Sequence, residues 1–591
     1  MSILRIPNEL LLWIAEYLSI KSLNHFLLTC RQLKLLLTPL LYKHGLKDIS
    51  GLTALQLAAQ DGHAFLAELA ILGGADIEQL WDWSGLLWTP LHSAAYFGHL
   101  RVARILTKHG ANVAAIDINQ QTPLHLAANS GYSTVITTLV EHGADTAAND
   151  LNQQTPLHLA ANSGHSTVFS TLVKYGANIN ASDSNKQTPL HLAVLAQNEE
   201  AIKVLLDLGA DMLCLDDSTK MPANYAAYNG SVGCMKAFID AGFDITSQKP
   251  PWNRTVLHDA ADSNEIDIVK YLLEQERSEM IVNTRQMDGA TALHLAVWRK
   301  SRLENIRLLL QHGADMGAMT NNGYTPVHLA IIWRDFCCLK AFIEAGFDTN
   351  IRGNIEKNPG WTILHEAIPA VGAEGMKMIE YLLEQEGGKA IINARDDNGS
   401  TPLHLAAGLG RSLGLVDLFY EEKPDRALHG REKVRLLVRF GADLKIKDNI
   451  GNTPAHVAAY RGDIGRMQPL LDSGLDFNSR GLCNRTILHA AIFGGRKMLE
   501  FLLSQQGIEM IINAQDSEGS TPLHLATLQS FEKEEMVRLL LHHGANPEEE
   551  DCCRAQSILD CAVQDKEGLY RKRLETLALR CGEKGAMECN N

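Results

Sequence analysis

The chain has 591 residues, of which 46% are hydrophobic and 21% charged, a composition typical of a soluble folded protein. Its net charge of −15 argues against general nucleic-acid binding through phosphates, and no uncharged apolar run approaches the roughly 18 residues that span a bilayer. The eleven cysteines are an odd number without regular spacing, which argues against a disulfide framework and favours a reducing compartment, the cytoplasm or the nucleus. We therefore expect neither nucleic acid nor membrane among the partners.

The first 47 residues differ in pattern and charge from the rest of the chain. They carry six Lys and Arg residues against two Glu, about +4 in a chain whose total charge is −15. Leucine and isoleucine at helical spacing predict three short helices in residues 1–47. A module of this size is small for independent stability, so we expect it to pack against a partner or the first repeat.

This segment resembles an F-box. The matching residues are Ile6-Pro7, Glu9, Ile14, Leu18, Leu23, Thr29-Cys30-Arg31 and Leu41-Tyr42, with Ile6 in place of the usual Leu, and Leu33 and Tyr42 where Trp is common. The resemblance implies docking on a Skp-type adaptor and, through it, on a cullin scaffold. Carried over by position, the adaptor-binding residues are Ile6, Pro7, Leu10, Ile14, Leu18 and Leu23. The alternative is that these residues only cap the end of a repeat array.

From residue 51 to 563 the phrase Thr-Pro-Leu-His-Leu-Ala recurs, mostly at steps of 33 to 39 residues. Complete copies start at Thr122, Thr155, Thr188, Thr401 and Thr521, and looser copies lie between them. A fixed period of this size indicates stacked supersecondary units. Such an array offers one long surface and no single closed core, so binding is the expected function.

Each unit has the signals for two helices and an extended loop. Thr122 is a good N-cap and Pro123 suits the first helical position, while Gly131 and Gly143 can end the first and second helices. This pattern closely resembles the ankyrin repeat, over about 15 units. The resemblance implies an all-α solenoid with short β-hairpin fingers, whose partners lie across the fingertips and first helices.

Three features depart from the regular unit. Gln120, Gln153 and Lys186 stand where the finger turn usually has Gly, which predicts differently shaped or looser tips. An unusual Leu-Leu-(Glu/Ser)-Gln-(Glu/Gln) tail at 272–276, 382–386 and 502–506 indicates a larger period of three repeats. The step from Thr401 to Thr453 is 52 residues, which predicts an insertion at about 409–431 between the unit's two helices. Residues 564–591 are expected to form a capping helix and tail.

Nothing in the sequence supports catalysis. Twelve of the 23 histidines lie three residues after a repeat Thr, one per unit, so they cannot converge on one metal, and we expect them to hydrogen-bond between adjacent units. Residues 410–414 match Gly-x-Ser-x-Gly, but they follow a helix where the nucleophile pattern needs a strand. Cys337-Cys338 and Cys552-Cys553 lack Cys-x-x-Cys spacing. We expect no enzyme activity, no metal and no cofactor.

Tryptophan is the strongest signal for a partner surface, because it is enriched among interface hot spots. The candidates for target binding are Trp81, Trp83, Trp88, Trp252 and Trp361 in the fingers, and Trp298 and Trp333 near the ends of first helices. The alternative is that each packs on its own finger. Together these features favour a substrate-recruiting adaptor of a cullin-type ubiquitin ligase; the alternative is an ankyrin scaffold or inhibitor with no ubiquitin role.

Overall fold

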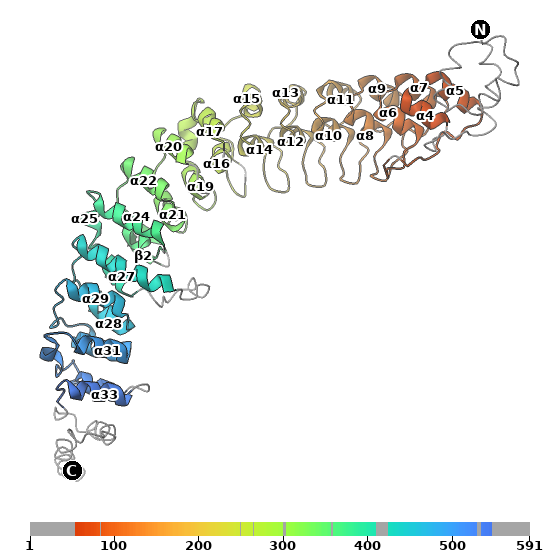
Figure 1. The fold of residues 1–591 in the computed structure, drawn as a ribbon. Coiled ribbons are helices and arrows are strands. Elements are labelled where there is room, and N and C mark those ends of the chain that lie inside the picture. The colour runs from red at the N-terminus through yellow and green to blue at the C-terminus, as the bar shows by residue number, and fades with distance from the viewer. Residues whose placement is uncertain are drawn as a thin grey trace, which may run out of the picture. The chain divides into compact units, whose positions relative to one another are not determined.

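The structure is a computed structural model that describes residues 54–82, 84–248, 250–263, 265–298, 303–355, 358–370, 372–408, 424–528 and 533–546. The F-box-like segment, Trp83, residues 409–423 of the predicted insertion and the predicted C-terminal helix lie outside these residues. The chain divides into two compact units, Met1–Met287 (unit 1) and Asp288–Asn591 (unit 2). In the described part, each unit is a stack of helix pairs joined by extended fingers (Figure 1).

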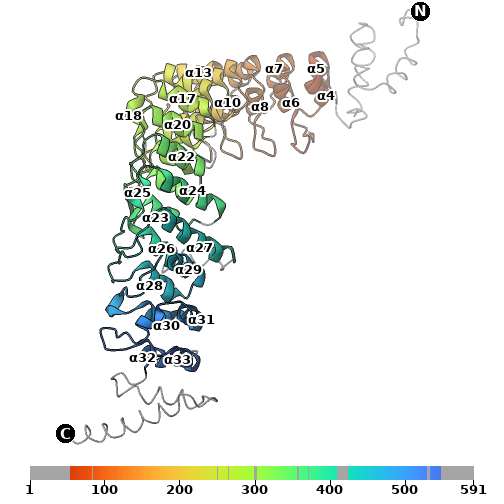
Figure 2. The ribbon, with the colours of Figure 1, turned by 60° about the vertical axis from the view of Figure 1, so that its left-hand side comes forward.

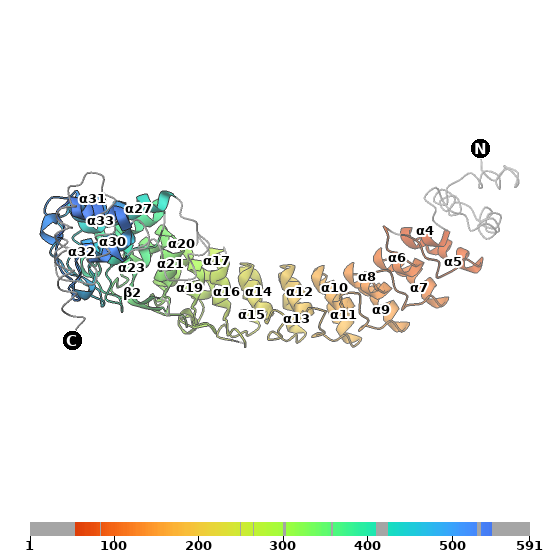
Figure 3. The ribbon, with the colours of Figure 1, turned by 90° about the horizontal axis from the view of Figure 1, so that it is seen from below.

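In unit 1 the first helices of the pairs are α4 (Ala54–Asp61), α6 (Pro90–Tyr96), α8 (Pro123–Asn129), α10 (Pro156–Asn162), α12 (Pro189–Leu195), α14 (Pro222–Tyr228) and α16 (Val256–Asp262). The second helices are α5 (Ala64–Leu72), α7 (Leu100–Lys108), α9 (Ser133–Glu141), the 3-10 turn η2 (Ser166–Val168) with α11 (Phe169–Lys174), α13 (Glu199–Asp207), α15 (Val232–Asp240) and α17 (Ile266–Leu273). The first helices form one row and the second helices another (Figure 3).

Unit 2 repeats this arrangement (Figure 2). Its first helices are α19 (Ala292–Trp298), α21 (Pro326–Ile332), α23 (Ile363–Ala367), α26 (Pro402–Gly408), α28 (Pro454–Arg461), α30 (Ile487–Gly494) and α32 (Pro522–Thr527). Its second helices are α20 (Leu303–Gln311), α22 (Phe336–Glu344), α24 (Ala373–Glu384), α27 (Pro424–Arg439), α29 (Ile464–Asp472), α31 (Arg496–Leu503) and α33 (Lys533–His542). One finger contains the antiparallel strands β1 (Arg352–Ile355) and β2 (Asn358–Thr362), and another the 3-10 turn η4 (Leu482–Asn484).

First helices begin as the sequence predicts, at a Thr followed in most units by Pro. Thr89 shows why, because its hydroxyl accepts from the His92 main-chain N–H while Nδ1 of His92 accepts from the Thr89 N–H at 3.2 Å. Two orphan donors of the helix terminus are thus satisfied reciprocally. Gly131 (φ 80°) and Gly143 (φ 92°) follow α8 and α9 in the left-handed conformation that ends a helix.

The packing between repeats depends on small side chains in the first helices. Ala127 and Ala128 on α8, and the equivalent Ala160 and Ala161 on α10, are fully buried. Alanines at these positions let successive first helices approach closely, while Val135 and Leu139 on α9 fill the space between the two rows. Each repeat therefore buries its apolar surface mainly against its neighbours.

The finger turns do not follow the prediction. Gln120, Gln153 and Lys186 adopt φ values of 59°, 57° and 56°, in the same left-handed region as Gly323 (80°) and Gly451 (94°). The expectation of differently shaped tips at these three positions is therefore wrong.

Hydrogen bonds explain why a non-glycine residue takes this conformation. Asp117 N–H donates to Gln121 O, and Gln120 N–H donates to Asp117 O, both at 3.0 Å, as Thr320 and Gly323 do in a glycine-containing finger. Asp117 Oδ1 also accepts from the main-chain N–H groups of Asn119 and Gln121, each at 2.8 Å. These bonds offset the roughly 1–2 kcal/mol that a left-handed L-residue costs.

The larger three-repeat period has a structural counterpart. Each of the three unusual tails is followed by one extra short helix: α18 (Ser278–Val282), α25 (Gly388–Ile391) and the 3-10 helix η5 (Ile508–Ile511). Their apolar residues, such as Ile281 and Ile391, are buried. These short helices therefore add apolar packing to the repeats that carry the tails.

The 52-residue step places its extra residues between α26, which ends at Gly408, and α27, which begins at Pro424. Residues 424–431, assigned to the insertion by sequence, form the first half of α27. Among the described residues no helix is both long and apolar enough to span a bilayer.

Candidate binding surface

The repeat histidines link each first helix to the next finger. In His125, Nδ1 accepts from the Thr122 N–H at 3.1 Å and Nε2 donates to the Gln154 carbonyl of the following repeat at 3.0 Å. Burial lowers the pKa of His125, which keeps the ring neutral and preserves this pattern of one donor and one acceptor. The same inter-repeat bond is made by His92, His158, His191, His294, His365, His404, His456 and His489, so the predicted role of these histidines is confirmed.

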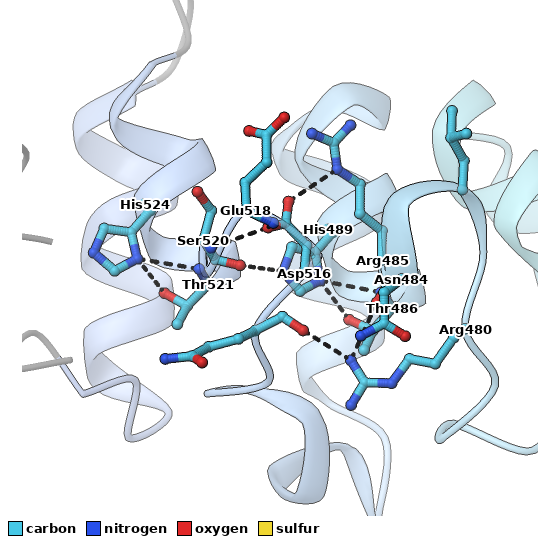
Figure 4. Close-up of polar contacts among 12 residues, drawn as sticks. Arg480, Asn484, Arg485, Thr486, His489, Asp516, Glu518, Ser520, Thr521 and His524 are labelled. Carbon is cyan, nitrogen blue, oxygen red and sulfur yellow. Dashed lines mark hydrogen bonds and ion pairs between the residues drawn. The ribbon is translucent and has the colours of Figure 1, made fainter. Parts of the chain in front are cut away.

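A second link joins neighbouring fingers through side chains. The residue just before the repeat Thr (the donor position) donates to an aspartate five residues before the next repeat Thr (the finger aspartate). Gln154 Nε2 reaches Asp183 Oδ2 at 3.4 Å in this way, and Arg485 Nε reaches Asp516 Oδ2 at 3.2 Å (Figure 4). Figure 4 also shows the histidine bond of the same repeat, from His489 to the Ser520 carbonyl.

Two of the predicted target-binding tryptophans belong to this internal ladder. Trp88 donates from Nε1 to the finger aspartate Asp117 at 3.3 Å, pairs its main chain with Trp81, and is 1% exposed. Its assignment to target binding is therefore wrong, because the side chain is buried between two fingers. Trp361 is half-buried, donates to Asp396 at 3.2 Å and stacks on His365.

Three other tryptophans are open to solvent. Trp252 lies in a finger of unit 1 and is 53% exposed. Trp298 and Trp333, at the ends of α19 and α21 in unit 2, are 54% and 40% exposed, with ring centroids 6.0 Å apart. Trp81 is partly exposed. The positions of Trp298 and Trp333 near the ends of first helices are as predicted.

Trp298 belongs to a row of residues that sequence reasoning did not single out. The seventh residue after the repeat Thr lies within about two residues of the end of each first helix; we call these positions the +7 row. In unit 2 the exposed large apolar members are Trp298, Ile332, Tyr460, Phe493 and Leu528, each 40–59% exposed. Tyr460 and Phe493 stack with centroids 5.5 Å apart. The repeat period contains this signal, since the row appears once the repeats are aligned on Thr.

The +7 row is more apolar in unit 2 than in unit 1. In unit 1 its members are Gln60, Tyr96, Asn129, Asn162, Leu195, Tyr228 and Asp262. Tyr96 and Leu195 are exposed, but polar residues separate them. Neighbouring exposed apolar members at the ends of first helices are thus a property of particular repeats in unit 2.

The sequence itself assigns this architecture to a family. A family model of ankyrin repeats in three copies matches residues 26–117, 55–150, 124–216, 223–320, 425–514 and 467–551, which together cover more than half of the chain. The chain belongs to the ankyrin-repeat family. Two further ankyrin models match residues 299–343 and 359–397. No F-box domain was found, and the first ankyrin match begins at residue 26, inside the predicted F-box-like segment.

Curated relatives share the repeats within longer proteins. The chain is similar to the human transient receptor potential cation channel subfamily A member 1, 26% identical over 55% of this chain and 30% of the channel. It is similar to the E3 ubiquitin-protein ligase KEG of Arabidopsis thaliana, 24% identical over 46% of this chain and 18% of the ligase. The nuclear factor NF-kappa-B p105 subunit of Gallus gallus is 30% identical over 28% of this chain and 16% of that protein. The chain thus spans under a third of each of these relatives.

Ankyrin repeats imply a protein–protein interaction. Within the described ranges, no three His, Cys, Asp or Glu side chains form a group able to hold a metal ion. The repeat histidines and finger aspartates hold neighbouring repeats together, whereas the +7 row of unit 2 presents large apolar side chains to solvent.

Proposed function

We propose that the chain binds a target protein across the +7 row of unit 2 and carries out no chemistry of its own. The observation that supports this is the exposure of Trp298 and Ile332 on α19 and α21, and of Tyr460 and Phe493 on α28 and α30. Exposed apolar patches of this kind mark interaction sites in soluble proteins. Aromatic side chains on rigid helices supply contact area at small entropic cost, because few rotatable bonds are fixed on binding.

The finer proposal is that the chain is the target-recruiting subunit of a cullin-type ubiquitin ligase. It is supported by the F-box resemblance of residues 1–47, with Ile6, Pro7, Leu10, Ile14, Leu18 and Leu23 as adaptor contacts. The similarity of the repeats to those of a protein named as an E3 ubiquitin-protein ligase is compatible with it. Holding the target next to the ligase would raise its effective concentration there, in the cytoplasm or the nucleus.

The adaptor is tested by a pull-down of the full chain with a purified Skp-type adaptor. We expect the parent chain to bind, a Pro7→Ala/Leu10→Ala variant to lose binding, and a Trp298→Ala/Trp333→Ala variant to keep it. If neither the parent nor the variants bind, the ligase proposal fails and the chain is an ankyrin scaffold or inhibitor whose first 47 residues cap the repeats.

The target surface is tested by quantitative mass spectrometry of proteins captured by the parent chain and by three variants. Trp298→Ala/Trp333→Ala removes one ring of the +7 row and the neighbouring ring, whose centroid is 6.0 Å away, and should lose a specific set of proteins that Pro7→Ala/Leu10→Ala retains. Trp81→Ala, in a finger of unit 1, is the matched aromatic control and should retain them. Equal capture by all three variants would contradict a binding role for the +7 row of unit 2.

A further inference from the structure

Unit 1 contains a pocket of about 220 Å³ that is lined by residues of three consecutive fingers. Its lining includes Lys220, Asn224, Trp252, Arg254, Asp259 and Gln286. Small-molecule sites usually have volumes of about 300–1,000 Å³, and a water molecule takes about 30 Å³ of liquid. The pocket is therefore small for a cofactor and of a size to admit one protein side chain.

The pocket lies where the finger ladder is interrupted. The finger-aspartate position, five residues before the repeat Thr, holds Pro250 before Thr255 and Gln286 before Thr291. The preceding donor positions hold two cations, Lys220 and Arg254. Lys220 and Arg254 are thus each followed by a finger that has no aspartate at the finger-aspartate position.

A regular finger of the same chain shows how an arginine at this position is normally satisfied. Arg485, at the donor position before Thr486, donates Nε to Asp516 Oδ2 at 3.2 Å (Figure 4). In Arg254 the same atom, Nε, is buried and has no hydrogen-bond partner in the described part of the chain. Leaving a buried donor of a charged group without a partner is unfavourable, so a carboxylate at this point would be favoured.

The carboxylates around the pocket are engaged by Arg254 and Asn224 and do not form an ion pair with Lys220. Arg254 Nη2 is already 3.3 Å from Asp259 Oδ1 and 3.9 Å from Asp262 Oδ2, and Asp259 accepts from Asn224 Nδ2 at 2.7 Å. Lys220 Nζ lies over the rings of Tyr225 (5.2 Å) and Tyr228 (4.8 Å), and no described residue forms a hydrogen bond or ion pair with this ammonium group. The pocket lining therefore contains two cationic side chains, of which Arg254 is paired with carboxylates and Lys220 forms no ion pair with a described residue.

We propose that this pocket receives the carboxylate of a Glu or Asp side chain from the target protein, between Lys220 Nζ and Arg254 Nε. The incoming carboxylate takes the role that Asp516 has beside Arg485, and Trp252 offers an exposed apolar contact next to it. Hydrogen bonds between charged partners are about twice as strong as neutral ones, which makes the pocket selective for an acidic segment. The inference rests on the proposed function, because it names the chemical class of target segment that unit 1 recognises.

The test uses the full chain and a fluorescein-labelled peptide, (Gly-Glu-Ala-Glu)₃, with (Gly-Gln-Ala-Gln)₃ as its uncharged counterpart. Fluorescence anisotropy should show the glutamate peptide binding at least tenfold more tightly than the glutamine peptide. Lys220→Gln should weaken binding of the glutamate peptide at least tenfold. Arg485→Gln removes a cation that is already paired with Asp516. This variant should leave binding of the glutamate peptide unchanged.

A second pair of variants tests the geometry. Gln286→Asp restores a finger aspartate beside Arg254, so it should block the glutamate peptide and raise the urea midpoint relative to Gln286→Asn. Equal binding of the two peptides, a blocked pocket in Gln286→Asn, or a lower midpoint for Gln286→Asp than for Gln286→Asn would overturn the proposal. These outcomes are separate from target capture by the +7 row of unit 2, which uses none of these residues.

Discussion

Lowering the pH from 7.5 to 5 should destabilise the repeats, because their histidines are held neutral by burial. Burial lowers the pKa of four histidines of unit 2 from 6.5 to about 4; they are His328, His365, His456 and His489. A folded-state pKa below the unfolded value means that the unfolded chain binds more protons between pH 6.5 and 4. Their contribution to stability is therefore fully present above pH 6.5 and is lost as the pH falls through this window.

The size of the effect follows from the two pKa values. At pH 5 each of these histidines costs about 2 kcal/mol of folding free energy, so the four together cost about 8 kcal/mol. Glu366 acts in the opposite direction, since burial raises its pKa to about 7 and its neutral form is favoured at low pH. Acidification from pH 7.5 to 5 increases stability by about 2 kcal/mol through Glu366, so these five groups together lower the free energy of unfolding by about 6 kcal/mol.

The assay is urea unfolding followed by circular dichroism at pH 7.5, 6 and 5, where the midpoint should fall at each step. A matched variant is His489→Asn, since the chain already uses Asn224 at the same position, with Oδ1 accepting from the Met221 N–H at 2.9 Å. Asparagine cannot titrate, so this variant should lose about 2 kcal/mol of the pH dependence. An unchanged midpoint between pH 7.5 and 5, or the full pH dependence in His489→Asn, would refute the reasoning.

Three further predictions concern stability and are checked by urea midpoints. Trp88→Ala should cost about 3–5 kcal/mol because the ring is buried, whereas Trp252→Ala should stay within about 0.5 kcal/mol because that ring is exposed; similar losses for both would contradict their assignment. Gln153→Gly should stabilise by about 1 kcal/mol by removing left-handed strain, with Gly323→Ala destabilising as the converse control. Thr89→Ala should cost about 0.5–2 kcal/mol because the hydroxyl that accepts from the His92 main-chain N–H is lost, and no loss would show that the cap is dispensable.

Local patterns in the sequence predicted the repeat correctly. The period, the Thr-Pro helix starts and the histidine bonds between units all follow from short-range chemistry, because the same few residues meet the same main-chain groups in every repeat. The tip conformation at Gln120 was missed, since a glycine-based rule does not include the Asp117 hydrogen bonds that hold a non-glycine residue in place.

The binding surfaces were predicted less well, because exposure depends on neighbouring repeats. Trp88 and Trp252 both lie in fingers, Trp88 one residue and Trp252 three residues before a repeat Thr. Trp88 occupies the donor position, where Asp117 of the next finger accepts its indole N–H, whereas the donor position of the later finger holds Arg254 and Trp252 is 53% exposed. The burial of Trp88 thus depends on a contact with the following finger, 29 residues along the chain.

The sequence by itself therefore determined the family, the helix pairs and the bonds that join them, because these arise from contacts repeated within one period. Only the tertiary structure decided which side chains are free to meet a partner. The +7 row and the Lys220–Arg254 pocket exist because repeats stack: burial of one finger against the next satisfies most polar groups, and the few left without their counterpart mark the candidate sites.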